Sequence, residues 1–400
     1  MPHIFKNPAL KVRDFRTVLT GQSISSIALS GQEIAIAWVV LEITNSPLWV
    51  GTALALCEIP SLIFGLPLGS LADRFDRSRL LKFIECIHAS IFLTLGILTI
   101  TGNLSLWHLL MLGFATGSVR CLQEITRLTL AYDMVTNNSE VSALSLVHIS
   151  NRAGTFVGFL LIGSVMERVS LEAAYFSLSV LSLISFIILF GLKPQVTQVN
   201  SPKDQLGLRF FYKEVRKNAR LKTLLVTTAV LEILGFSFAT ALPFITRDIL
   251  NLGPEALGLL HAAGSIGGTL ALVILISRGD AIDKAKIYLI AIVLMAIFIL
   301  ALAHSQVFLL VLLAILCIES VAVTCDVMSQ ALIQDTVPEH MRGRAMGAWV
   351  LAIGTLPIGQ IEMGLLIGMI NVSGALSVNA FAIFFLVAYA RFALKKSNNQ

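Results

Sequence analysis

Twelve apolar segments separated by short polar stretches run through this chain of 400 residues. A membrane-spanning helix needs about 20 mainly apolar residues, and lipid demands that every backbone polar group be bonded within a helix or a closed barrel. Charged residues make up only 13% of the chain, against roughly 25% in soluble proteins. We therefore expect an all-α membrane protein with twelve transmembrane helices, and we exclude an ordinary soluble enzyme. The segments lie near residues 17–43, 50–69, 80–100, 106–130, 141–165, 172–191, 222–247, 254–277, 285–303, 306–330, 342–368 and 372–391.

Lysine and arginine are distributed unevenly among the stretches that join these segments. If the N-terminus is cytoplasmic, 24 of the 29 basic residues fall on the inner side of the membrane, and only Arg168 and Arg247 fall outside. The remaining three, Arg120, Arg127 and Arg152, lie within or at the ends of the apolar segments. Cytoplasmic loops carry such an excess of basic residues. We therefore expect a multi-pass protein of the plasma membrane, the inner membrane in a bacterium, with both termini inside. Contact with anionic lipid accounts for the net charge of +5 without a nucleic-acid partner.

One long polar stretch, residues 192–221, divides the chain into two halves, residues 1–191 and 222–400. Aromatic and aliphatic residues stand among basic ones at 208–220, which favours a short helix on the inner membrane surface over a charged tether. Ordered matches between the halves, at offsets of 207 and 202 residues, indicate a duplicated six-helix unit. In transporters, parallel repeats of this kind have a substrate site between them near the midplane and rock against each other. The matched pairs are Pro47 and Pro254, Gly51 and Gly258, Asp73 and Asp280, Arg77 and Lys284, and Glu124 and Asp326.

The turn between the second and third segments carries the sequence Gly69-Ser-Leu-Ala-Asp-Arg-Phe-Asp-Arg-Ser-Arg-Leu80. It resembles the signature loop of the major facilitator superfamily, G-x-L-A-D-R-x-G-R-[RK]-x-L. Residues 45–51, 211–221 and 337–344 are similar to the branch of drug:proton antiporters that includes the enterobactin and macrolide exporters. The resemblance implies the major facilitator fold, with twelve helices in two pseudo-symmetric halves.

By this resemblance, Asp73 latches the cytoplasmic side closed with Arg77 as its partner. The alternative is that these charges only set the topology. Asp76 stands where the family has its second glycine, and aspartate tolerates a left-handed turn. The expected cytoplasmic gate consists of Gly69, Asp73, Arg74, Arg77, Asp280, Lys284, Arg342 and Arg344.

Several ionisable residues fall inside the apolar segments, where a charge is costly unless it is paired or hydrated. Glu33, beside Gln32, lies near the middle of the first segment, and we expect it either to exchange protons or to be hydrogen-bonded to a neighbouring helix. Arg120-x-x-Gln123 resembles the R-x-x-Q-G motif of the antiporters, with Glu124 in place of glycine. Arg120 and Glu124 could also neutralise each other, because they are four residues apart on a helix. The expected proton-coupling or cavity residues are Glu33, Gln32, Arg120, Glu124, Arg127, Glu232 and Asp326, and further intramembrane acids are Glu58, Glu319 and Glu362.

Three glycines of the fifth segment, Gly154, Gly158 and Gly163, are spaced as in the antiporter motif G-x3-G-P-x-x-G-G, although its proline is missing. Small residues at this spacing let membrane helices approach closely. We expect these glycines to serve helix packing.

The sequence shows neither a HExxH zinc motif nor a close pair of histidines, and it has no GxxxxGK[ST] loop for ATP. We therefore expect no enzymatic activity, no metal and no cofactor. The expected function is proton-coupled efflux of small amphipathic compounds, such as drugs, macrolides or a siderophore, by a monomer in the lipid bilayer. The alternatives are facilitated or ion-coupled uptake of a metabolite or lipid, and a non-transporting membrane sensor.

Overall fold

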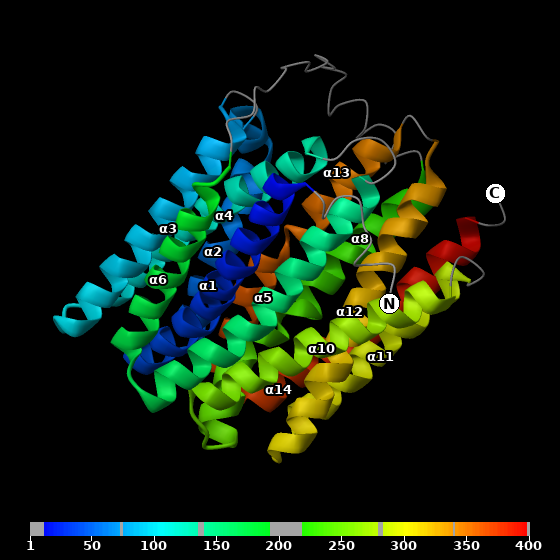
Figure 1. The fold of residues 1–400 in the computed structure, drawn as a ribbon. Coiled ribbons are helices and arrows are strands. Elements are labelled where there is room, and N and C mark those ends of the chain that lie inside the picture. The colour runs from blue at the N-terminus through cyan, green and yellow to red at the C-terminus, as the bar shows by residue number, and fades with distance from the viewer. Residues whose placement is uncertain are drawn as a thin grey trace. The chain divides into compact units, whose positions relative to one another are not determined.

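A computed structural model of the chain describes residues 12–72, 75–134, 140–192, 218–278, 283–338 and 341–397. These residues form helices, and none of them lies in a strand (Figure 1). The helices of the first half are α1 (Arg13–Thr44), α2 (Pro47–Ala72), α3 (Arg77–Ile100), α4 (Leu106–Asp133), α5 (Glu140–Arg168) and α6 (Leu171–Leu189). Those of the second half are α8 (Ala219–Leu234), η3 (Phe236–Ala241), α9 (Leu242–Phe244), η4 (Ile245–Ile249), α10 (Pro254–Arg278), α11 (Lys284–His304), α12 (Phe308–Thr336), α13 (Arg342–Ile353) and α14 (Leu356–Ser397).

Ten segments of the described residues are long and apolar enough to span a bilayer. Two differences explain why ten spans correspond to the twelve expected helices. The polar residues of α4 lower its hydropathy, so it is not among the ten, and the last span, Arg342–Arg391, contains two of the expected helices. The boundary expected between 368 and 372 is present, because the backbone leaves the helical region at Ile370 and reaches φ 65° at Asn371.

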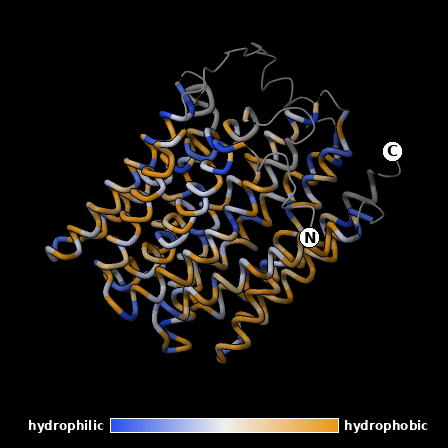
Figure 2. Tube along the Cα trace, viewed as in Figure 1, coloured by the Kyte–Doolittle hydropathy of each residue, from blue (hydrophilic) through white to orange (hydrophobic). Residues whose placement is uncertain are grey.

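Apolar residues follow most of the length of the helices, and hydrophilic residues gather mainly toward their ends (Figure 2). Many large apolar side chains face outward, including Ile276 at 80% and Phe385 at 78% exposed. In water such surfaces would mark an interaction site. On helices of this hydropathy they fit a lipid surrounding.

Helices α3 and α11, one in each half of the sequence, begin in the same way. Asp76 accepts a hydrogen bond from the backbone nitrogen of Arg79 at 2.8 Å, and Asp283 accepts one from that of Lys286 at 3.1 Å. Both aspartates are therefore N-caps, and they are 207 residues apart in the sequence. Asp76 has φ −59°, so it does not use the left-handed conformation that aspartate tolerates, and capping explains the residue at this position.

The chain forms two compact units. Unit 1 contains residues 1–44, 56–201 and 252–262, and unit 2 contains residues 45–55, 202–251 and 263–400. In unit 1, α1 packs against α5 and α6, and α3 packs against α4 and α6. In unit 2, α14 packs against α8 and α11, and α12 packs against α11. Each unit thus includes one short helical segment from the other half of the sequence, the start of α10 in unit 1 and the start of α2 in unit 2.

Candidate functional site

Unit 1 contains a polar cavity of about 320 Å³ between α1, α2, α4 and α5. It is lined by Ser26, Leu29, Ser30, Glu33, Glu58, Ser61, Arg120, Gln123, Glu124, Arg127, Asn151 and Thr155. Five of these twelve side chains are ionisable, although the helices that carry them are otherwise apolar. Bilayer-spanning helices keep ionisable residues for a protein interior or a watered cavity, so this cavity is the strongest candidate for a functional site in the described part of the chain.

Helical periodicity brings the lining residues together. Ser26, Ser30 and Glu33 on α1 are spaced by four and three residues, and so are Arg120, Gln123 and Arg127 on α4, in the opposite order. Residues at these spacings share one face of a helix. The cavity therefore lies where the polar stripes of α1 and α4 meet.

Close packing of α1 and α5 sets one wall of the cavity. A Cβ added at Gly154 would come within 3.0 Å of the Ser23 carbonyl oxygen, and one added at Gly158 would come within 3.0 Å of Ser30 Oγ. The two glycines let the α5 backbone approach α1 directly. Asn151, one turn before them, can then reach the side chains of α1.

An ion pair joins α2 and α4 at the cavity. Arg120 Nη2 contacts Glu58 Oε1 and lies 3.5 Å from the Cys57 carbonyl oxygen. The side chains of the pair are 31% and 32% exposed. Arg120 thus pairs across helices, and the pairing with Glu124 expected within α4 is not the one found.

A second set of polar side chains, almost fully buried, connects the lining residues Gln123 and Arg127 to Glu85 and Gln22 behind the cavity wall. Gln123 Nε2 donates to Glu85 Oε1 at 2.6 Å and to Ser25 Oγ at 2.8 Å. Glu85, Gln123 and Arg127 are 2%, 2% and 6% exposed. Arg127 Nη1 donates to Gln22 Oε1.

Gln22 extends this layer to α5. Its Nε2 donates to Ser26 Oγ at 2.8 Å and to Asn151 Oδ1 at 3.1 Å, and Ser26 Oγ also donates to Asn151 Oδ1 at 2.6 Å. Buried polar groups need partners of this kind. The layer therefore holds the cavity wall of α1, α4 and α5 in one arrangement.

Glu85 and Asn151 were missed by the sequence analysis. Glu85 lies in the third apolar segment, five residues after its expected start at 80. A usable signal was its spacing of three residues from His88, which places two ionisable groups on one face of that helix. Asn151 carries no charge and gave no signal.

The other predicted residues of α1 and of the gate fall in several places. Glu33 is exposed toward the cavity, whereas Gln32 is 5% exposed and does not line it.

Asp73, Arg74 and Asp280 of the expected gate lie outside the described residues, as does the expected surface helix, except for its last three residues at 218–220. Gly69 lies in α2, Arg77 is buried at the start of α3, and Arg342 and Arg344 lie in the first turn of α13. Lys284 Nζ pairs with Asp335 Oδ2 at 2.7 Å.

The predicted acids of the second half lie in unit 2. Glu232 on α8 is 5% exposed, and it interacts electrostatically with Asp326 on α12. Glu232 follows Ser25 by 207 residues. Both repeats therefore bury polar side chains at this level of their first helix.

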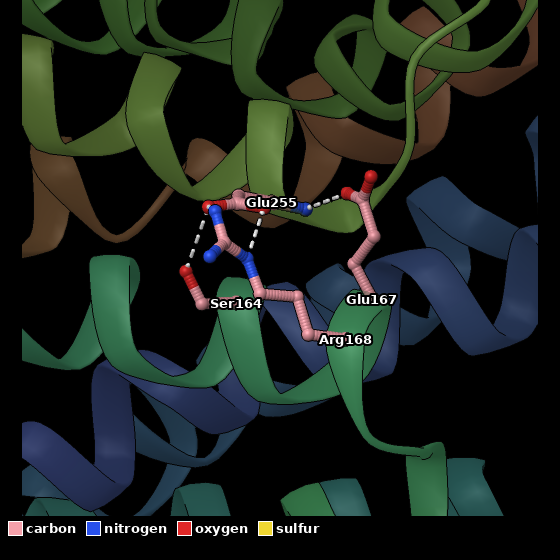
Figure 3. A network of polar contacts seen from close by, with 4 residues as sticks. All are labelled: Ser164, Glu167, Arg168 and Glu255. Atoms are coloured by element: carbon pink, nitrogen blue, oxygen red, sulfur yellow. Dashed lines mark hydrogen bonds and ion pairs between the residues drawn. The ribbon is translucent and has the colours of Figure 1, made fainter.

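A further polar cluster joins α5 to the start of α10 within unit 1 (Figure 3). Arg168 holds Glu255 with two bonds, Nε to Oε2 at 2.9 Å and Nη2 to Oε1 at 2.5 Å. Ser164 Oγ donates to Glu255 Oε1 at 3.1 Å, and the backbone nitrogen of Glu255 donates to Glu167 Oε2 at 2.8 Å. The distribution of basic residues predicts that Arg168 lies outside the membrane but predicts no partner for it.

Small residues support this cluster. A Cβ at Gly163 would come within 3.0 Å of the Pro254 carbonyl oxygen, and one at Gly258 would come within 3.0 Å of the Phe159 carbonyl oxygen. Gly163 therefore packs against the start of α10, and not against α1 as Gly154 and Gly158 do.

Among the described residues, no group of three or more His, Cys, Asp and Glu side chains could hold a metal ion.

Comparison with known proteins relates the whole chain to membrane transporters. It is 19% identical to the staphyloferrin A transporter of Staphylococcus aureus over 383 residues, which covers 92% of this chain and 94% of that protein. It is 23% identical to the multidrug resistance protein MdtG of Escherichia coli over 265 residues, 65% of this chain and 63% of that protein.

The fold is that of solved transporters with little sequence similarity. The nucleoside transporter NupG superimposes with a TM-score of 0.78 at 14% identity, covering 96% of this chain and 99% of that one. The peptide transporter POT in complex with sulfate superimposes with a TM-score of 0.75 at 10% identity, covering 96% and 95%. A family model described as Major Facilitator Superfamily matches residues 18–359 and 224–398, and the chain therefore belongs to the Major Facilitator Superfamily.

Proposed function

We propose that this transporter exports small amphipathic compounds in exchange for protons by alternating access. The observation that carries the proposal is the cavity of unit 1, in which five ionisable side chains meet inside apolar helices. Three of them are carboxylates, and a carboxylate in such a place can bind and release a proton during the cycle. The relatives support the substrate class, because one is named a staphyloferrin A transporter and another a multidrug resistance protein.

The charges of the cavity favour substrates that carry a positive charge. Glu58 and Arg120 neutralise each other, which leaves Glu33, Glu124 and Arg127, two negative groups and one positive. A cavity lined mainly by charges of one sign raises the local concentration of ligands of the opposite charge. We propose that Glu33 and Glu124 face the substrate and that Glu33 exchanges the coupled proton.

The halves at 1–191 and 222–400 are the proposed moving parts, with both termini in the cytoplasm and a monomer as the working form. The proposed cytoplasmic gate still consists of Gly69, Asp73, Arg74, Arg77, Asp280, Lys284, Arg342 and Arg344. The further proposed cavity or coupling residues are Gln32, Arg127, Glu232 and Asp326.

Cells lacking their own efflux pumps and expressing this protein test the proposal, with ethidium as a fluorescent amphipathic cation. We expect less ethidium to accumulate than in cells with an empty vector, and we expect a protonophore to abolish the difference. A difference that survives the protonophore would contradict proton coupling. Increased accumulation would instead indicate uptake, and equal accumulation would contradict the export of amphipathic cations.

A further inference from the structure

We propose that Glu85, the buried acid behind the cavity, exchanges a proton during transport and acts on the cavity through Gln123 and Arg127. Its role in transport rests on the proposed function. The binding of a proton by Glu85 does not, and it can be measured without any substrate.

The first argument is the set of hydrogen bonds around Glu85. Oε1 accepts from the neutral amide of Gln123 at 2.6 Å. Oε2 is buried and has no hydrogen-bond partner among the described residues. The hydroxyls of Ser25 and Ser185 lie beside Glu85, but neither makes a hydrogen bond to Oε2, and that of Ser185 donates to the Gly21 carbonyl oxygen at 3.0 Å. An ionised carboxylate here would keep one oxygen without a donor.

The second argument is the placement of the nearest cation. Arg127 is one turn from Gln123 on α4, and its Nη1 donates to Gln22 instead of Glu85. A buried charge without an ion-pair partner is strongly unfavourable, and unsatisfied hydrogen-bonding groups beside it make its burial more unfavourable still. The arrangement seen here therefore suits a neutral Glu85 that carries its proton on Oε2.

The third argument is that the surroundings offer a second arrangement. Arg127 Nε is buried and has no hydrogen-bond partner among the described residues, and Arg127 interacts electrostatically with Glu85. When the proton leaves Glu85 for a water molecule in the cavity, the O–H bond at Oε2 breaks and an O–H bond to that water forms. The carboxylate then attracts Arg127, and the bond to Gln22 weakens.

Other ionisable groups near Glu85 are few. His88, three residues along α3, is fully buried, and α4 contributes Arg120 and Glu124 beyond Arg127. The facing positions of α1 and α6 carry neutral groups, Gln22, Ser25 and Ser185. Arg127 is therefore the cation that responds to the charge of Glu85.

This response reaches the substrate without any contact between Glu85 and the substrate. Arg127 and Gln123 both line the cavity, next to Glu124. Movement of Arg127 toward Glu85 would take positive charge away from Glu124. Loss of the Glu85 proton would thus favour a cationic substrate, and binding of such a substrate would favour release of the proton. Glu85 is in this sense a positioning residue.

Infrared titration of the full-length protein in liposomes tests whether Glu85 binds a proton. We expect a carbonyl stretch of a protonated carboxylic acid that disappears reversibly as the pH is raised and is missing in Glu85→Gln. The matched control is Glu33→Gln, which should keep this band. If Glu85→Gln and the wild type have the same carboxylic-acid bands at every pH, the proposal is overturned.

A second variant keeps the test valid if Glu85→Gln does not fold. Gln123→Leu retains Glu85 but removes the hydrogen bond to Oε1, so the same band should move to higher frequency and still titrate. An unchanged band would show that the acid observed is not Glu85. A role for Glu85 in packing alone would produce neither result.

The transport consequence is measured with ethidium across a range of external pH. Wild-type export should depend on pH, and Glu85→Gln should flatten that dependence while ethidium still binds. A pH profile identical to that of the wild type would overturn the coupling role. If no variant exports ethidium, the proposed function fails, while the infrared result on Glu85 stands or falls separately.

Discussion

Single ionisable side chains carry most of the functional argument in this protein. Glu33 faces the cavity directly, whereas Glu85 is separated from it by Gln123. Glu58 differs from both because it is paired with Arg120. The three glutamates are therefore expected to respond differently to the same substitution.

Replacing Glu33 with glutamine removes a proton-binding group but keeps a polar side chain of similar size. We expect Glu33→Gln to bind ethidium but to export it at least tenfold more slowly than the wild type when a proton gradient drives export. Ethidium export and fluorescence-detected binding check the two parts. Retention of proton-driven export by this variant would assign coupling to another acid.

Replacing Glu58 with glutamine leaves Arg120 without its partner. The loss of one partner of a partly buried ion pair should lower the free energy of unfolding by about 2 kcal/mol, seen as a lower melting temperature in detergent. The double variant Glu58→Gln/Arg120→Gln should recover part of this loss, because no charge is left unpaired. If the double variant is as unstable as the sum of the single variants, the pair does not stabilise the cavity.

At the scale of helices, the contacts are set by glycines where backbones meet. A methyl group at Gly158 would collide with Ser30 of α1, whereas nothing lies within 4 Å of a Cβ at Gly368. Overpacking typically costs about 1–3 kcal/mol, and alanine is a better helix former than glycine. We expect Gly158→Ala to lower the melting temperature and Gly368→Ala to keep or raise it. Equal effects of the two variants would mean that α1 and α5 can separate freely.

The Arg168–Glu255 pair links helices from different halves of the sequence. If the halves rock during transport, this pair must open and re-form once in each cycle. We expect Arg168→Glu to slow ethidium export severalfold with little effect on stability, because solvent screens an exposed ion pair and it contributes little to folding. The exchanged pair Arg168→Glu/Glu255→Arg should restore export. Failure of the exchange would indicate that Ser164 and Glu167 fix the geometry to the original charges.

Across the whole molecule, the sequence predicted the class, because the length of an apolar run is enough to identify a membrane helix. It predicted the family through the resemblance of residues 69–80 to the signature loop of the superfamily. The division of the last span near Asn371 was visible in the sequence, while the irregular backbone at η3, α9 and η4 was not. The lining residues of α1 and α4 could be found because charges stand out in apolar segments. The bond between Gln123 and Glu85 could not, because it depends on how α3 and α4 are rotated against each other.

Purified protein in liposomes with an imposed pH gradient gives the most direct test of proton-coupled export. With the cytoplasmic face of the protein outward and an acidic interior, we predict that ethidium accumulates inside and that collapse of the gradient with a protonophore releases it. Equal ethidium levels with and without the gradient, from protein that binds ethidium, would contradict the account.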